Sequence, residues 1–234
     1  MLTFETINEL TLKVTCTGND VLYTKAGAFI AGECPQGKNY KFEKVLLGPQ
    51  SNIGQAVIGS LMRRVTKENI PLMKVNLNGD SVTYYANNGQ HVVIYQLAEG
   101  ETISVESENI LAFTQDCHYS VRFIGVGVLS QKGLATSTLT GHGRNAYVAV
   151  LSDGNPIVIS NVMSHTSISV DPDAVICWIS NGHCDPQVTI DVSWKTFIGQ
   201  TSGESYQFEW HGNAEVTVII QPSERTGGVE ISMD

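Results

Sequence analysis

Short apolar runs that alternate with polar residues recur along most of the chain, separated by turn residues. This period of two places successive side chains on opposite faces of a β-strand. The clearest predicted strands are 10–14, 119–124, 188–192 and 216–220. Dipeptides that accept the positive φ of tight hairpin turns lie between such runs: Asn78-Gly79, Asn88-Gly89 and Asp153-Gly154. The pattern therefore predicts an all-β protein with antiparallel hairpins.

An internal repeat is visible in the same pattern. Residues 82–118 can be laid over residues 147–183 without a gap, and both segments keep the same alternation. The matching pairs are Gly89 with Gly154, Val93 with Val158, Ile94 with Ile159, Phe113 with Trp178, and His118 with His183. Such self-similarity indicates a duplicated structural unit.

A third, weaker copy lies near the N-terminus, where residues 23–30 follow the pattern of 105–112 and 170–177. We therefore expect one compact domain, 1–234, made of three lobes. The C-terminal strand is expected to complete the first lobe and to protect an open sheet edge there. The predicted lobes are 1–50 with 214–222, then 74–140, then 141–213.

One segment has a helical period instead. Apolar residues at spacings of one, three and four between residues 54 and 68 form an amphipathic stripe, and Pro71 ends it. We expect a short helix there, plugging one end of the β structure, with contact to a membrane surface or a partner as the other interpretation.

Composition and cysteine use bound the class of protein. An apolar content of 42% with 16% charged residues is typical of a globular chain, and no apolar run is long enough to span a bilayer. The first residues lack the pattern of a signal or transit peptide. Five cysteines without a CxxC pair argue against a disulfide framework. A cytoplasmic location is expected.

The net charge of −9 disfavours binding to a polyanion. The basic groups Lys38, Lys41 and Lys44, and Arg63, Arg64 and Lys67, are expected to be solvated surface. Nucleic acid is therefore not an expected partner.

Two adjacent pairs, Cys117-His118 and His183-Cys184, are the candidate metal ligands, because the repeat places His118 on His183. A zinc site needs about four converging N or S ligands, usually with two closely spaced on a turn. The chain has no HxH or CxxC spacing. We therefore expect no metal and no cofactor, and Cys177 is expected to be a small core residue.

Other catalytic patterns also fail. Residues 48–54 resemble a phosphate loop in glycine spacing, but Gln55 replaces the lysine that would meet the phosphate. No GxSxG elbow or spaced triad occurs. The acidic pairs Glu99 with Glu101 and Asp171 with Asp173 fall in predicted turns, where solvated carboxylates are usual. The tryptophans are expected in the core or in subunit contacts; they are Trp178, Trp194 and Trp210.

Four motifs in register resemble the mitochondrial biogenesis (altered inheritance of mitochondria) protein family over nearly the whole chain. They are residues 24–31, 139–143, 169–178, and 202–204 with Gln221-Pro222. The family is similar in fold to the tryptophan RNA-binding attenuation protein, TRAP. The resemblance therefore implies TRAP-like double-stranded β-helix or β-sandwich lobes that form trimers. It implies little chemistry, because bacterial members lack an assigned activity and the yeast member is linked to inner-membrane organisation. His142 stands where a proline is common in the family.

We expect a non-enzymatic oligomeric scaffold or interaction protein, most simply a homotrimer, with no catalytic residues. Similar lobes present similar faces, which favours closed cyclic association. One alternative is a module that binds a small ligand or RNA, and the other is a cupin-like metalloenzyme. The sequence names no ligand-binding residue for either alternative.

Overall fold

The computed structural model describes residues 1–45, 72–124, 134–190 and 206–222. Within these ranges the regular structure is β-strand, apart from two short 3₁₀ helices, η1 (Ser107–Asn109) and η2 (Pro172–Ala174). The all-β prediction is therefore confirmed. The helix expected at 54–68 lies outside the described residues.

The strands form three consecutive groups of six that are connected in the same order. The N-terminal unit, preceded by β1 (Leu2–Ile7), contains β2 (Thr11–Cys16), β3 (Asn19–Lys25), β4 (Phe29–Glu33), β5 (Tyr40–Val45), β6 (Leu72–Asn78) and β7 (Ser81–Tyr85). The central unit contains β8 (His91–Gln96), β9 (Glu101–Val105), β10 (Ile110–Thr114), β11 (Cys117–Ile124), β12 (Leu134–Gly141) and β13 (Tyr147–Ser152). The C-terminal unit contains β14 (Ile157–Ser160), β15 (Ile168–Val170), β16 (Val175–Asn181), β17 (Gln187–Ile190), β18 (Tyr206–Trp210) and β19 (Val216–Ile220).

Each unit uses its six strands in the same way. Its first, sixth and third strands are hydrogen-bonded neighbours in that order, and so are its fourth, fifth and second strands. The four antiparallel sheets are β1-β2-β7-β4, β5-β6-β3-β10-β13-β8, β11-β12-β9-β16-β19-β14 and β15-β18-β17. The two six-stranded sheets therefore each take three strands from one unit and three from the next.

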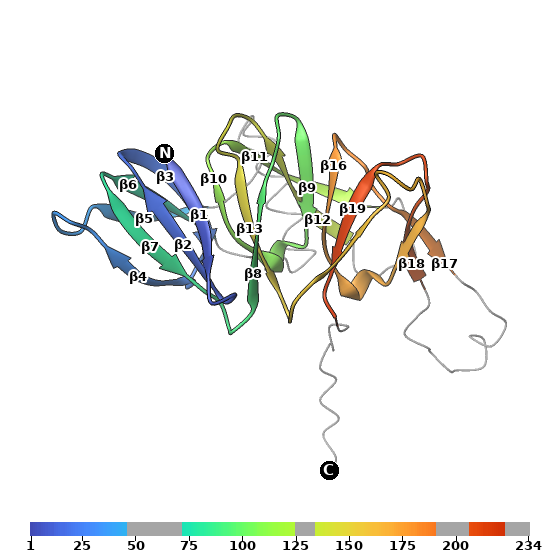
Figure 1. Ribbon diagram of the computed structural model, residues 1–234, viewed down its shortest axis with the longest axis horizontal. Helices are drawn as coiled ribbons and strands as arrows, with labels where there is room; N and C mark the ends of the chain where they lie inside the picture. Colours follow the sequence, from blue (N-terminus) through green and yellow to red (C-terminus); the bar gives the residue numbers. More distant parts are fainter. Residues whose placement is uncertain (46–71, 125–133, 191–205, 223–234) are drawn as a thin grey trace, which may run out of the picture.

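The strand pairs that join neighbouring units, here called seams, are β3 with β10 and β9 with β16. Figure 1 shows the three units in a row, with β4 at one end and β17 and β18 at the other. Because each seam is a backbone hydrogen-bond ladder, neighbouring units share continuous sheets and are not merely packed side by side.

The third strand of every unit has a register shift at the same place. In β4 the shift lies between Phe29 and Ala31, in β10 between Ile110 and Ala112, and in β16 between Val175 and Cys177. A β-bulge bends its strand and increases the local twist. The shared bulge also fixes which residues correspond between units: Ala31, Ala112 and Cys177.

Turn residues were identified correctly, but the expected hairpins are wrong. Gly79, Gly89 and Gly154 have positive φ, as predicted. However, β6 and β7, β7 and β8, and β13 and β14 belong to different sheets. The two strands that flank each glycine turn do not pair with each other. Each of these turns therefore connects one sheet to another.

The C-terminal strand is also placed differently from the expectation. β19 pairs with β14 and β16 in the C-terminal unit, and not with strands of the N-terminal unit. The N-terminal unit already has its six strands, because β6 and β7 follow β5 after the undescribed segment 46–71. The expected pairing of 214–222 with residues 1–50 is therefore wrong.

Several large aromatic side chains of the described residues are buried inside the chain. Phe113 is stacked between Tyr23 and Tyr119, with ring centroids 5.1 and 5.8 Å away. Trp178 and Trp210 are buried with centroids 5.6 Å apart. Phe113 and Trp178 both lie on seam strands, so they hold units together within one chain and are not free for contact between chains.

Candidate functional site

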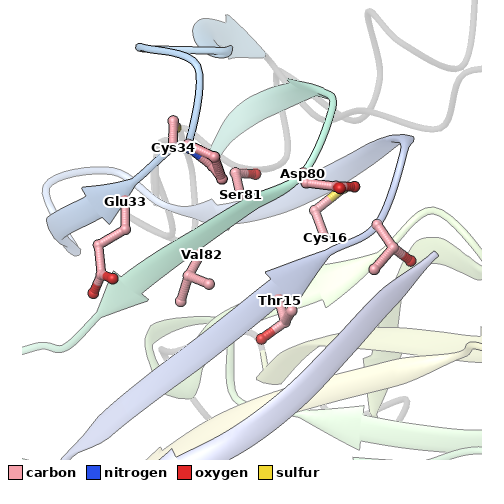
Figure 2. A pocket seen from close by; sticks show the side chains of 9 residues that line it. Thr15, Cys16, Glu33, Cys34, Asp80, Ser81 and Val82 are labelled. Carbon is pink, nitrogen blue, oxygen red and sulfur yellow. The ribbon is translucent and has the colours of Figure 1, made fainter.

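A pocket of about 440 Å³ opens at one end of the first sheet, in the N-terminal unit. It is lined by Thr15, Cys16, Thr17, Glu33, Cys34, Pro35, Asp80, Ser81 and Val82. Figure 2 shows that these residues come from the ends of β2 and β4 and from the start of β7. Three adjacent strands thus line the pocket. Its side chains include two carboxylates and two thiols.

The rim is held by a short chain of hydrogen bonds around Asp80. The Gly18 amide donates to Asp80 Oδ1 at 3.0 Å, and Asn39 Nδ2 donates to the Asp80 carbonyl at 2.9 Å. Cys34 Sγ in turn donates to Asn39 Oδ1 at 2.9 Å. These bonds tie the β2–β3 turn, the β4–β5 loop and the β6–β7 turn together. The Asp80 carboxylate therefore holds the rim together through Gly18.

Among the residues that line the pocket, Ser81 has a buried hydroxyl without a hydrogen-bond partner in the described part of the chain. Its side chain is 3% exposed, and its hydroxyl makes no hydrogen bond within the described part of the chain. A buried hydroxyl without a partner costs free energy, so such groups usually bind ordered water or a ligand. Ser81 is therefore the lining residue at which a water or ligand would supply a hydrogen bond that the described part of the chain does not.

The two thiols of the pocket are not arranged to form a disulfide with each other. Cys16 faces Ser81 across β2 and β7, while Glu33, next to Cys34, faces Val82 across β4 and β7. The thiols thus lie two strand spacings apart, roughly 10 Å, beyond the reach of a disulfide. Burial raises the pKa of Cys16, which donates to the Gly18 carbonyl at 3.2 Å. A thiol held protonated in this way is a poor nucleophile.

The candidate metal ligands of the sequence occupy several separate environments. His118 lies at the start of β11 near His142, with ring centroids 6.0 Å apart. Burial raises the pKa of the neighbouring Cys117 to about 12. The Cys184 carbonyl accepts hydrogen bonds from Trp178 Nε1 at 2.7 Å and from Trp210 Nε1 at 3.4 Å. In the described residues, no three His, Cys, Asp or Glu side chains are grouped to hold a metal.

The acidic pairs cap turns. Glu99 Oε2 accepts the Gly143 amide at 2.7 Å, and its Oε1 lies 3.3 Å from His142 Nδ1. Glu101 accepts the Ala98 amide at 2.9 Å. Asp171 accepts the Asp173 amide at 2.8 Å at the start of η2. Glu101 and Asp171 thus bind the backbone of their own turns, whereas Glu99 binds the backbone of the turn after β12.

Other predicted groups are surface features or fall outside the described ranges. Lys41 pairs with Glu43 at 3.1 Å, and the Lys38 ammonium lies 5.3 Å from the centre of the Tyr40 ring. The phosphate-loop-like segment 48–54, the basic group at 63–67 and Trp194 lie outside the described residues. Within the described ranges no helix has the length and apolar character that crossing a bilayer requires.

Sequence reasoning did not identify the pocket. Its lining comes from three strands whose neighbours in space are far apart along the chain, and none of the residues forms a local motif. The turn at 78–80 is the only part with a sequence signal, and that signal indicated a hairpin.

The fold defines a class of protein: an all-β chain whose consecutive six-strand units share sheets. Its sequence matches the family described as mitochondrial biogenesis AIM24 over residues 4–223, and the chain belongs to this family. The resemblance found in the sequence motifs is thereby confirmed.

Among solved structures, the chain is similar to protein SPYM3_0169 from Streptococcus pyogenes. The TM-score is 0.66 at 16% sequence identity, over 96% of this chain and 94% of that one. At this identity the likeness concerns the fold alone. No curated protein matches the sequence.

Proposed function

We propose that this chain is a non-enzymatic scaffold that assembles with copies of itself, most simply as a homotrimer. The observation that carries this proposal is the sharing of sheets between units. At each inner boundary, a β-ladder joins strands of two units into one sheet. The terminal sheets β1-β2-β7-β4 and β15-β18-β17 lack such a second unit. Within the chain, one unit extends the sheet of the next by pairing strands. The same strand pairing can extend a sheet from one chain to another.

The three units are, on this proposal, duplicated TRAP-like lobes. The common strand order, the common bulge in the third strand and the sequence repeat all support this view. Duplicated lobes present similar faces in similar orientations, which favours closed cyclic association.

The C-terminal unit carries an apolar surface suited to a protein partner. Ile157 and Val158 of β14 are 50% and 58% exposed, and Val162 and Met163 in the following turn are 41% and 92% exposed. Four large apolar side chains are thus exposed within residues 157–163, and exposed apolar groups of this kind are available for contact with another protein. This surface gives the scaffold a place to hold another protein.

We further propose a reducing compartment such as the cytoplasm. All five cysteines are free thiols, and Cys16, Cys117 and Cys177 are buried as small apolar residues. This arrangement suits a compartment in which thiols stay reduced.

Light scattering on a gel-filtration peak tests the assembly. At micromolar concentration and moderate salt we expect a mass of three chains, with pairwise interfaces of more than about 1,000 Å². A mass of one chain under these conditions would remove the scaffold proposal.

Ser81 favours one second candidate, the binding of a small polar ligand in the pocket of the N-terminal unit. Native mass spectrometry of freshly purified protein would then show a bound small molecule. The variant Ser81→Leu, which fills the pocket, should lack that added mass, while Ser164→Leu in an exposed turn should keep it. Identical masses of protein and denatured chain would rule the candidate out.

A further inference from the structure

The two seams within the chain have the same register. At the first seam Ala112 of β10 faces Thr24 of β3, and at the second Cys177 of β16 faces Val105 of β9. Ala112 and Cys177 are the residues just after the bulge in their strands. In both seams the second strand of one unit therefore meets the third strand of the next at the same position.

The ends of the chain carry these same two strands without a seam. Among the described residues, β4 has a sheet neighbour on one edge alone, and so does β15. β4 is the third strand of the first unit and β15 the second strand of the last. The chain thus exposes one complementary half of a seam at each end.

Burial distinguishes these end strands from their counterparts. Every residue of β10 is buried, and so are Val175 to Trp178 of β16. In β4, by contrast, Ile30 is 57% exposed and residues 31–33 are exposed. Ser169 of β15 is also exposed, whereas Ser104 of β9 is 3% exposed. The positions that seams bury inside the chain are open at its ends.

We propose that β15 of one copy pairs antiparallel with β4 of the next copy, an inference that rests on the proposed self-assembly and names its contact. The corresponding register places Val170 opposite Ala31, Ser169 opposite Gly32 and Ile168 opposite Glu33. The pairing joins the sheet β17-β18-β15 to the sheet β4-β7-β2-β1 of the neighbour. The partner is therefore a second copy of this chain.

A backbone bond seen at the second seam has a counterpart in this contact. The Glu106 amide, just after β9, donates to the Ile176 carbonyl inside the β16 bulge at 3.2 Å. The equivalent groups are the Asp171 amide of one copy and the Ile30 carbonyl of the next. The bulge in β4 is thus already shaped to receive the strand end that follows Val170.

The contact joins different chains, because β4 and β18, the neighbour of β15, lie at opposite ends of the row of units (Figure 1). Joining one surface to a different surface forms a ring when the rotation closes. Closure also pairs the free edges of β4 and β15, and an unpaired edge can otherwise template unwanted strand pairing. A closed ring of three copies satisfies both conditions.

Cross-linking tests the register directly. Gly32 and Ser169 are exposed and stand directly opposite each other in the proposed register. In a background of Cys34→Ser and Cys184→Ser, the pair Gly32→Cys and Ser169→Cys is treated with a short bis-maleimide. We expect covalent oligomers that end at the trimer. Mixing the two single variants should give dimers, whereas each single variant alone should give none.

Two controls keep this test specific. The pair Gly32→Cys and Val188→Cys, with the second cysteine on the outer strand β17, should not cross-link. Cross-linking by one single variant alone would mean that like edges meet, and would overturn the proposal. An edge covered by another part of the same chain would give no cross-link, which overturns it as well.

Light scattering on the same untreated proteins distinguishes a failure of the β15–β4 contact from a failure of self-assembly. A trimer that fails to cross-link would refute the β15–β4 contact and leave the scaffold proposal standing, whereas a monomer would refute both. A second variant, Ser169→Asp, places a carboxylate at a position that the contact would bury, as the second seam buries the corresponding Ser104. It should lower the mass to one chain, while Ser164→Asp should leave the trimer intact; a trimer that survives Ser169→Asp would contradict the contact.

Discussion

Gly212 lies directly against the backbone carbonyl of His165, so that a Cβ at position 212 would overlap the carbonyl oxygen. Gly141 meets the Ala98 carbonyl in the same way. Both glycines follow the fifth strand of their unit or end it, and the carbonyls belong to the connection between the first and second strands. The two units therefore share a close backbone approach that any side chain would disrupt.

The variant Gly212→Ala should be destabilised by roughly 1–3 kcal/mol, because the backbone must shift to admit the methyl group. Urea unfolding followed by tryptophan fluorescence measures this. Asn213→Ala, in the same turn but exposed, should change the free energy of unfolding by less than about 0.5 kcal/mol. Equal stability of the two variants would contradict the close approach.

The Cys184 carbonyl accepts hydrogen bonds from two indoles, of which the bond from Trp178 is shorter. Trp178→Phe should therefore cost more stability than Trp210→Phe, by about 1 kcal/mol. The double variant leaves the carbonyl without either donor and should cost more than the sum of the single variants. If the losses of unfolding free energy of the two single variants simply add up in the double variant, the two hydrogen bonds do not share an acceptor.

Thiol reactivity should follow burial. Burial raises the pKa of Cys16, Cys117, Cys177 and Cys184, and the thiolate is the reactive form. With iodoacetamide at about pH 8, native protein should therefore be alkylated first at Cys34 and last at Cys177. Peptide mass spectrometry reads the order, and urea-unfolded protein, in which all five react alike, is the control. Early alkylation of Cys177 would contradict its burial.

Glu99 should contribute to acid sensitivity. The Gly143 amide first, and His142 second, lower the pKa of Glu99 below its ordinary 4.5. A lowered folded-state pKa gives stability that is present above the ordinary pKa and is lost as pH falls through the folded value. The difference in unfolding free energy between wild type and Glu99→Gln should thus shrink as pH falls from about 6 to about 3.

The variant His142→Ala serves as the control for Glu99, because it removes the lesser of the two partners. Its loss of stability should be smaller than that of Glu99→Gln at neutral pH. A constant difference between wild type and Glu99→Gln across this pH range would mean that the carboxylate does not titrate with folding.

Metal content tests the cupin-like alternative. His118 and His183 are not part of any group of three potential ligands in the ranges that the structure describes. Protein purified without chelator should therefore carry far less than one equivalent of zinc, iron, manganese or nickel by elemental analysis. A stoichiometric metal that is lost in His118→Ala or His183→Ala would show a metal site and contradict this expectation.

The sequence by itself determined the local structure. Alternation along residues 216–220 and 119–124 predicted β19 and nearly all of β11, because a strand with one buried face imposes a period of two on its own residues. Positive φ at Gly89 and Gly154 also followed from residue type, since glycine lacks the Cβ that makes this region unfavourable. The family, too, was readable from motifs in register.

Only the tertiary structure decided which strands pair. The pairing of β3 with β10 and of β9 with β16 joins strands far apart in the chain, and alternation is the same whichever partner a strand has. The position of β19, the change of sheet at each glycine turn and the pocket around Ser81 all depend on those pairings. Hydrogen bonding between backbones carries no residue code, so these features became visible when the strands were placed in space.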